Sequence, residues 1–173
     1  MAHKMNQINI QCYKTKIGKL ILGSFDGKLC VLDFEYRKMR KIVDSRIKKN
    51  LKAEFVEQDT QVLRETRKQL DEYFNGYRKA FDIPLLMAGT DFQKSVWNAL
   101  IEVPYGETST YLQLAKDIGG EKSVRAVASA NGANAIVLMI PCHRIIGSDG
   151  GLIGYGGGLP VKKRLLKLEQ SIL

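Results

Sequence analysis

One cysteine in this sequence has neighbours that could make it a nucleophile. Cys142 is followed directly by His143, and Glu169 comes later in a predicted C-terminal helix. A thiol is a strong nucleophile only as the thiolate, which a nearby base can generate. Adjacent side chains on a strand point to opposite faces, so a bridging water is the easier route for the proton to reach His143. Glu169 could then orient the imidazole in the manner of a catalytic triad.

The same residue types also have a purely structural interpretation. Cysteine is among the most frequently buried residues, and a histidine beside it can simply satisfy a backbone carbonyl. For an isolated Pro-Cys-His this interpretation is favoured. The other two cysteines, Cys12 and Cys30, lie on predicted strands without a base or charge partner, and we assign both to the core. No Cys-x-x-Cys or paired-histidine spacing occurs, so we expect no metal.

The N-terminal half predicts a small antiparallel sheet with one covering helix. Apolar residues alternate or cluster in three stretches between residues 8 and 32, and Asp26-Gly27 is a favoured tight-turn pair. Thr60 could cap a helix that ends at Asn75-Gly76. Residues 82–85 could add one more strand.

The C-terminal half changes to a helical pattern. Phe92, Val96 and Leu100 recur at helical spacing and predict a helix that ends before a proline. Two short helices, about 110–118 and 123–131, are separated by a turn whose length and glycine content suit helix-turn-helix geometry. That spacing is a weak indication of DNA binding by itself, because such turns are common in other proteins.

The segments before and after Cys142 predict a strand, a glycine-rich loop and a helix, in that order. The apolar run Ile136–Ile140 predicts a buried strand, and it is far too short to span a bilayer. Many glycines follow between residues 147 and 158, where they would let the backbone approach a ligand. Pro160 then opens a last helix. Leu165, Leu166 and Leu168 are expected to face the core.

Length and charge limit the possible classes of protein. The 173 residues fit one large domain or two small ones. We predict an α+β fold with an N-terminal sheet domain at 1–85 and a mostly helical C-terminal domain with a helix-turn-helix at 86–173.

Lysine and arginine exceed aspartate and glutamate by 27 to 18, for a net charge of +9. This excess would favour binding of a polyanion, but it would equally be found on a solvated surface. The odd number of cysteines and the lack of a secretory leader pattern favour a location in the cytoplasm, or with the DNA in the nucleoid or nucleus.

A set of ordered motifs covers residues 86–170. They are Thr90-Asp91-Phe92-Gln93, Val96-Trp97, Val103-Pro104-Tyr105-Gly106-Glu107-Thr108, Arg125-Ala126-Val127, Asn131-Gly132, Ile140-Pro141-Cys142-His143-Arg144, Gly154-Tyr155-Gly156-Gly157-Gly158-Leu159 and Leu165-Leu166-Lys167-Leu168-Glu169. This half of the chain resembles the O6-alkylguanine-DNA alkyltransferases, and the number of ordered matches makes coincidence negligible. The N-terminal half resembles that family only loosely.

The resemblance implies a single irreversible transfer of an alkyl group from guanine O6 to Cys142. It implies that His143 takes the thiol proton through water, that Glu169 orients His143, and that Asn134 organises the site. Tyr111 is expected to donate a proton toward guanine N3. Such hydrogen bonds stabilise the negative charge that develops on the leaving purine. No cofactor is expected.

The resemblance also implies how the substrate is recognised. The carbonyls of Cys142 and Ile145 would face the exocyclic amine of guanine, and the amide of Gly156 would face O6. Tyr155 is expected to line the same pocket. The target base must be flipped out of a double-stranded DNA containing O6-alkylguanine, at a cost of a few kcal/mol.

The second helix of the helix-turn-helix would enter the minor groove in this family. Arg125 would fill the gap left by the extruded nucleotide, although an exposed helical arginine is the simpler interpretation without that context. Small side chains would let the helix approach the DNA. They are Ala126, Ala128, Ser129 and Ala130. We expect a monomer that does not bind membranes.

The sequence departs from the family at two positions and leaves three alternatives to consider. Ala135 replaces a usual proline, and Ala128 replaces a frequent glycine. A non-enzymatic sensor of alkylated DNA would lack Cys142. A helix-turn-helix regulator would carry longer polar side chains on its recognition helix than the alanine-rich 123–131 segment. A cysteine hydrolase would turn over an ester without DNA.

Overall fold

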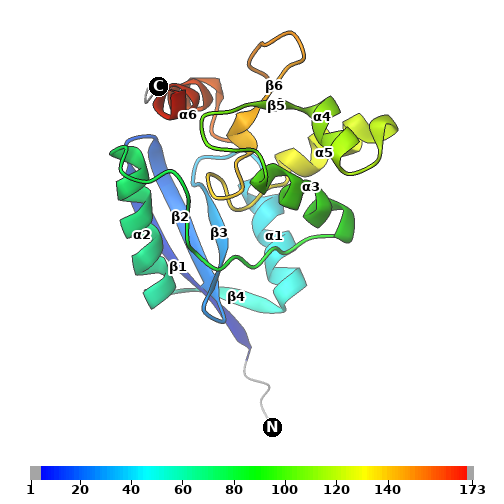
Figure 1. Cartoon of the computed structure of the whole chain (residues 1–173). Helices are drawn as coiled ribbons and strands as arrows, with labels where there is room; N and C mark the ends of the chain where they lie inside the picture. The colour runs from blue at the N-terminus through cyan, green and yellow to red at the C-terminus, as the bar shows by residue number, and fades with distance from the viewer. Residues whose placement is uncertain (1–4, 171–173) are drawn as a thin grey trace. The chain divides into compact units, whose positions relative to one another are not determined.

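The protein, represented by a computed structural model that describes residues 5–170, divides into two compact units (Figure 1). The first unit is Met1–Gly89 and the second is Thr90–Leu173. Thr90, the first residue of the second unit, is also the N-cap of a helix.

The first unit contains a four-stranded sheet with the order β3-β2-β1-β4. β1 pairs antiparallel with β2, and β2 with β3, which confirms the predicted antiparallel hairpins. Asp26 and Gly27 both have positive φ, as a two-residue hairpin turn requires. β4 was not predicted, and it pairs parallel to β1. The strands are β1 (Asn6–Thr15), β2 (Gly18–Phe25), β3 (Lys28–Phe34) and β4 (Ala53–Glu57).

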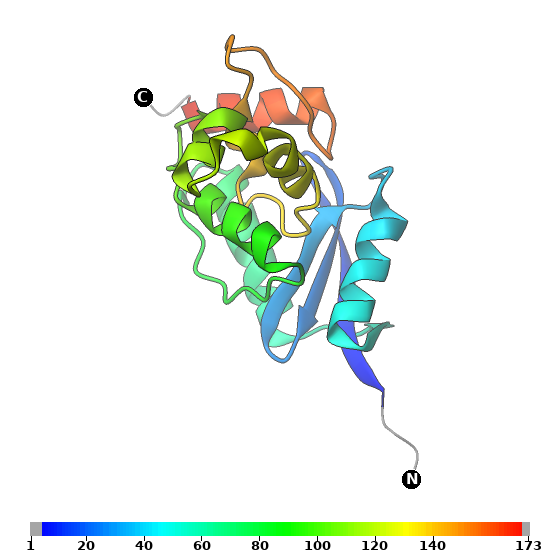
Figure 2. The same ribbon diagram turned by 90° about the vertical axis from the view of Figure 1, so that its right-hand side faces the viewer.

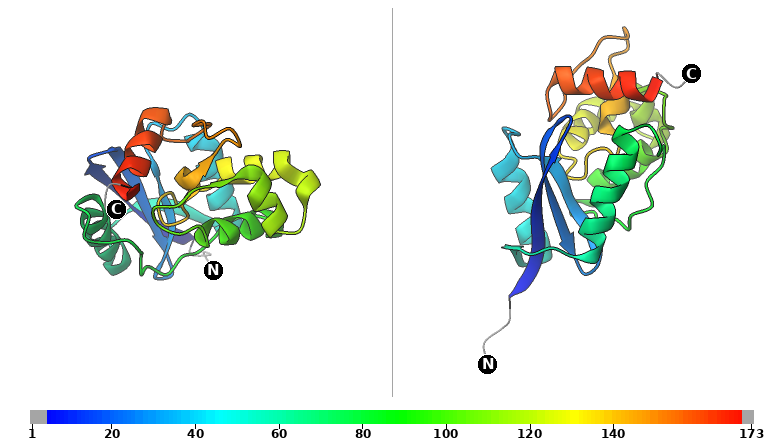
Figure 3. Two further views of the ribbon diagram at one scale, coloured as in Figure 1. Left: turned by 45° about the horizontal axis from the view of Figure 1, so that its top comes forward. Right: turned by 90° about the vertical axis from the view of Figure 1, so that its left-hand side faces the viewer.

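Two helices, α1 (Arg40–Leu51) and α2 (Gln61–Phe74), cover opposite faces of this sheet (Figures 2 and 3). α2 is the predicted covering helix, and the Thr60 side chain accepts a hydrogen bond from a backbone amide of its first turn. α1 was not predicted. Its only buried residues are Val43 and Ile47, so most of its sequence has the polar character of a surface segment.

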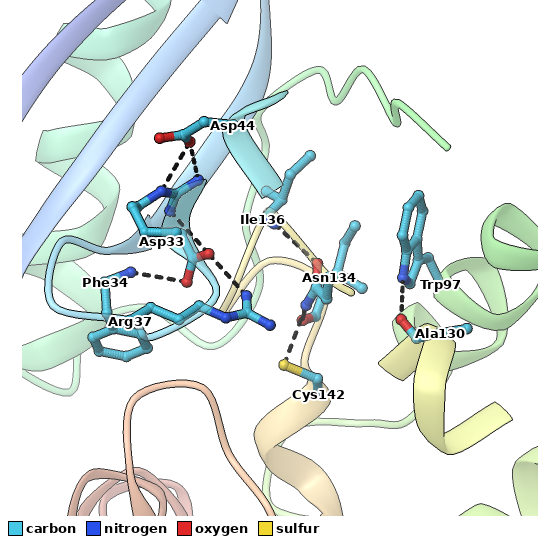
Figure 4. A network of polar contacts seen from close by, with 11 residues as sticks. Asp33, Phe34, Arg37, Asp44, Trp97, Ala130, Asn134, Ile136 and Cys142 are labelled. Carbon is cyan, nitrogen blue, oxygen red and sulfur yellow. Dashed lines mark hydrogen bonds and ion pairs between the residues drawn. The ribbon is translucent and has the colours of Figure 1, made fainter. Parts of the chain in front are cut away.

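Some arginines of a basic segment, residues 37–49, which overlaps α1, form ion pairs within the first unit. The fully buried Asp33 carboxylate lies 2.8 Å from Arg37 and 2.9 Å from Arg40. Arg40 also pairs with Asp44 (Figure 4). These arginines therefore contribute less free positive charge to the surface than the sequence alone indicates.

Two predictions for the first unit are wrong. Residues 82–85 do not form a strand, and only Leu85 makes an isolated bridge, to Leu29. Pro84 has no amide hydrogen to extend such a ladder. Cys12 is exposed rather than in the core. Its face of β1 is buried at Ile8 and half-buried at Ile10, so the covered part of that face ends before Cys12.

The second unit is mostly helical, as predicted. α5 packs against α3 and α4, and α6 packs against a short 3-10 helix, η2. The Trp97 indole donates to the Ala130 carbonyl at 2.9 Å and fixes α3 to α5 (Figure 4). The elements are α3 (Asp91–Ile101), β5 (Ser109–Thr110), α4 (Tyr111–Asp117), η1 (Glu121–Ser123), α5 (Val124–Gly132), η2 (Cys142–Arg144), β6 (Ile145–Ile146) and α6 (Leu159–Gln170).

Local sequence signals explain where α3 begins. Thr90 accepts a hydrogen bond from the Gln93 amide, and the Gln93 side chain accepts one from the Thr90 amide. This reciprocal pair is a capping box. Val96 and Leu100 are fully buried as expected, but Phe92 is 38% exposed. It lies in the first turn, and the buried stripe of the helix begins one turn later.

Residues 5–170 contain neither a helix that could span a membrane nor a cluster of side chains that could hold a metal ion. No helix there is long and apolar enough to cross a membrane. No group of three or more histidine, cysteine, aspartate or glutamate side chains within that range is arranged to hold a metal ion.

Candidate active site

The segment before Cys142 is a tight turn and not the predicted strand. Ile136–Ile140 makes only an isolated bridge between Val137 and Ile140, and Leu138 has a φ of 72°. The whole run is buried, which accounts for its apolar sequence without strand pairing. The Asn134 side chain holds the turn closed, because it accepts from the Ile136 amide at 2.9 Å and donates to the Ile140 carbonyl at 2.8 Å.

The same asparagine contacts the candidate nucleophile. The Asn134 amide nitrogen lies 3.2 Å from Cys142 Sγ and donates toward it (Figure 4). Cys142 begins η2 and is only 5% exposed. A donor directed at sulfur favours the charged thiolate over the neutral thiol. Asn134 therefore fixes both the backbone that leads to the cysteine and the environment of its sulfur.

His143 and Glu169 form the predicted pair. Nε2 of His143 lies 2.7 Å from a carboxylate oxygen of Glu169, and both side chains are fully buried. An ionised carboxylate can only accept, so Nε2 carries the hydrogen in this bond. The neutral ring then has its lone pair on Nδ1, which has no hydrogen-bond partner among the described residues. That nitrogen can act as a base.

Arg144 also binds Glu169, a role that the sequence interpretation did not assign. Its guanidinium makes two bonds of 2.9 Å to the two carboxylate oxygens and one of 2.7 Å to the Val103 carbonyl. Burial alone would raise the pKa of Glu169, but hydrogen bonds from His143 and Arg144 bring it down to about 2. Glu169 is therefore ionised at neutral pH. Nothing in the sequence spacing links Arg144 to a residue so far along the chain.

The surroundings of His143 keep its ring neutral. Burial lowers the pKa of His143 below 6.5, and the positive charges of Arg144 and Lys162 act in the same direction. The bond to Glu169 opposes this shift without reversing it. A neutral imidazole at physiological pH is the form that can take a proton from a thiol.

Tyr111 lies at the start of α4, where the Thr110 side chain caps the helix. Burial raises the pKa of the Tyr111 hydroxyl, and the negative charge of Cys142 adds to the shift. The hydroxyl therefore stays protonated and can donate a hydrogen bond. The buried Asn131 side chain donates to its oxygen at 3.5 Å, a weak contact that the sequence interpretation did not anticipate.

The glycine-rich segment approaches the same group of residues. A Cβ built on Gly154 would lie 3.8 Å from the Tyr111 hydroxyl, and Gly154 has a φ of 37°. Tyr155 is partly buried and Gly156 is exposed. Ile145 is buried in β6, which follows η2 directly and pairs parallel with β5. The residues expected to bind the base thus come from η2, β6 and the segment before α6.

The α5 helix presents a surface of small residues beside one arginine. Arg125, Ala126 and Ser129 are exposed, and Ala128 is partly exposed. Ala130 differs from the expectation, because its side chain is buried and its carbonyl accepts the Trp97 bond. Ala130 therefore packs inside the unit and does not belong to the exposed face.

Two protein-family models match the chain and together span most of it. Residues 91–171 match the DNA-binding domain of 6-O-methylguanine DNA methyltransferase. Residues 8–87 match the ribonuclease-like domain of 6-O-methylguanine DNA methyltransferase. The two matched segments lie within the two structural units.

Similar proteins and solved structures agree with these models. A methylated-DNA–protein-cysteine methyltransferase of Methanosarcina barkeri is 45% identical over 160 residues, which cover 92% of this chain and 96% of that protein. The crystal structure of Mycobacterium tuberculosis OGT in complex with DNA superposes with a TM-score of 0.81 at 37% identity, covering 95% of this chain and 93% of that one. The crystal structure of Mycobacterium tuberculosis O6-methylguanine methyltransferase has a TM-score of 0.78 at 37% identity, with the same coverage.

Proposed function

The chain belongs to the 6-O-methylguanine DNA methyltransferase family, and we propose that it repairs DNA by moving an alkyl group from guanine O6 onto its own Cys142. The observation that carries the proposal is the arrangement around the sulfur. Cys142 has the Asn134 amide 3.2 Å from its sulfur, and the adjacent His143 is held by Glu169, while its other ring nitrogen has no hydrogen bond to any side chain or backbone group of residues 5–170.

The reaction requires one proton transfer and one substitution at carbon. Nδ1 of His143 takes the Cys142 proton through a bridging water, and the imidazolium is stabilised by Glu169. The sulfur then attacks the alkyl carbon, so that an S–C bond forms and the C–O6 bond breaks. The electron pair of the broken bond stays with the guanine, which gains one proton. Overall, the thiol proton is exchanged for the alkyl group.

Tyr111 assists the departure of the base. Its hydroxyl is kept protonated, so it can donate toward guanine N3 as negative charge develops on the ring. The base leaves as neutral guanine, and the proton that Tyr111 gives up is replaced by the one that His143 took from Cys142. The thioether on Cys142 has no good leaving group, and the protein acts once and irreversibly without a cofactor.

Guanine is recognised by the backbone around the cysteine. The carbonyls of Cys142 and Ile145 accept from the exocyclic amine, the Gly156 amide donates to O6, and Tyr155 borders the ring. Acceptors that face an amine reject purines without one, because their lone pairs would be desolvated and unpaired.

DNA binding uses α4 and α5 as a helix-turn-helix. The exposed small residues of α5, namely Ala126, Ala128 and Ser129, allow close approach to the minor groove. Arg125 fills the space of the nucleotide that is flipped toward Cys142. The protein acts as a monomer in the compartment that holds the DNA. The segment 1–85 has a structural role, and 86–173 carries DNA binding and alkyl transfer.

A stoichiometry experiment tests this function. The protein is incubated with an excess of duplex that contains one O6-methylguanine, and restored guanine is measured over time. The proposal predicts a plateau at one guanine per protein molecule and none for Cys142→Ser. Continued turnover, or tight binding of the duplex without repair, would contradict it.

A further inference from the structure

Lys162, in the first half of α6, has a completely buried side chain. Its ammonium donates to the Ile145 carbonyl, to the Ile153 carbonyl at 2.6 Å and to the Gly154 carbonyl at 3.2 Å. A lysine ammonium has three donors, so these acceptors use all of them. No carboxylate among residues 5–170 forms an ion pair with it.

Burying a lysine at this position costs free energy, because its ammonium is removed from water. Burial disfavours the charged form and lowers the pKa of Lys162. Backbone carbonyls compensate only partly for the lost hydration of an ammonium. The presence of a lysine therefore indicates that the three carbonyls must be held in a defined arrangement.

The carbonyls belong to two segments that border the reactive cysteine. Ile145 closes the turn that Cys142 begins, because its amide donates to the Cys142 carbonyl. Gly154 belongs to the other segment and lies beside the Tyr111 hydroxyl. Lys162 thus joins the backbone that follows the nucleophile to the backbone next to the proposed proton donor.

We propose that Lys162 is a positioning residue for guanine recognition, which holds the Ile145 carbonyl where it accepts the exocyclic amine. The inference rests on the proposed function. A carbonyl oxygen has two lone pairs, so the bond from Lys162 leaves one for the substrate. A charged donor also restricts the orientation of its acceptor more strongly than a neutral donor. Lys162 acts on specificity through the backbone and does not touch the substrate.

The test compares two substrates that differ only in the exocyclic amine. Duplexes containing O6-methylguanine or O6-methylhypoxanthine are reacted with the protein, and the ratio of the two second-order rate constants is measured. The native protein is expected to prefer guanine roughly tenfold, the factor that one hydrogen bond typically supplies. Lys162→Met is expected to reduce that ratio to about twofold, mainly by slowing the guanine reaction.

Lys163→Met is the matched control, because Lys163 is the exposed neighbour on α6. It should keep the native ratio of the two rate constants.

Circular dichroism verifies that each variant folds, and Lys162→Gln replaces the methionine variant if that variant does not fold. A native ratio in a folded Lys162 variant would overturn the inference, as would a native protein without a preference. If neither variant folds, Lys162 is a structural residue and the inference is rejected. Absence of transfer from both substrates to native Cys142 would instead reject the proposed function itself.

Discussion

Glu169 serves two partners at once, and this sharing sets the chemistry of the histidine. Arg144 holds both carboxylate oxygens, while His143 bonds to one of them. The arginine keeps the carboxylate ionised. Its positive charge also offsets part of the effect by which the carboxylate raises the pKa of the imidazole. His143 is thus oriented by a carboxylate without becoming permanently protonated.

The first prediction concerns pH. The pKa of His143 lies below 6.5, chiefly because of burial, and only the neutral ring can accept the thiol proton. The rate of alkylation should therefore decline in acidic solution with a midpoint below pH 6.5. The second-order rate constant is measured from about pH 5 to 8 at constant ionic strength. A midpoint at or above 6.5 would show that the ring is not shifted as described.

The second prediction concerns the stability that Glu169 provides. Glu169→Gln leaves the buried Arg144 without its anion and should lower the free energy of unfolding by about 3 kcal/mol at pH 7. The pKa of Glu169 is lowered to about 2 from 4.5, so its contribution is complete above 4.5 and is lost as pH falls toward 2.

Urea unfolding at pH 7 and at about pH 3 measures both effects. The difference between native protein and variant should shrink at the lower pH. Glu121→Gln is the control, since this exposed carboxylate should change stability by less than about 0.5 kcal/mol. An equal difference at both pH values would contradict the assignment.

These residue-level roles could be predicted only in part. The adjacency of Cys142 and His143, with the family motifs, was enough to predict the nucleophile and the base that we propose. Arg144 and Lys162 were missed because their partners are a distant carboxylate and backbone carbonyls. Backbone carbonyls occur at every residue, so the sequence contains no signal for which of them a buried lysine will meet.

At the scale of elements, caps and periodicity predicted most of the helices. Thr60 and Thr90 both cap helices whose apolar residues recur at helical spacing. α1 was missed because only Val43 and Ile47 of its residues are buried. The Ile136–Ile140 run was mistaken for a strand because complete burial makes a turn as apolar as a buried strand.

The third prediction tests the role of α5. Arg125→Ala should slow alkylation by an O6-methylguanine duplex at least about tenfold. Without the arginine, no side chain fills the space that the flipped nucleotide leaves in the duplex, so the flipped state is less stable. Reaction with free O6-methylguanine base should be unchanged, since no flipping is needed. Arg164→Ala removes an exposed arginine from α6 and is the control. Equal loss on duplex and free base would place Arg125 in the alkyl-transfer site instead.

At the scale of the whole molecule, the net charge of +9 suits a DNA-binding protein, although ion pairs with Asp33 and Asp44 hold two arginines of the basic segment. The length and composition allowed either one or two domains. The division at Gly89 depends on which residues contact each other, and composition contains no information on that.

The fourth prediction follows from the net charge. Phosphate contacts release counterions, so affinity for undamaged duplex should fall at least about tenfold between roughly 50 and 200 mM salt. Fluorescence anisotropy with a labelled duplex measures this dependence. An affinity that does not change with salt would mean that the positive surface does not face DNA.

The central claim is that Cys142 itself receives the alkyl group, and intact-mass spectrometry tests it most directly. The protein is incubated with a duplex that contains one O6-methylguanine, and Cys142→Ser is treated identically. We predict that the native protein gains one methyl group in place of one hydrogen, that peptide mapping localises it to Cys142, and that the variant gains none. An unchanged mass after tight binding of that duplex would identify a damage sensor and contradict the account.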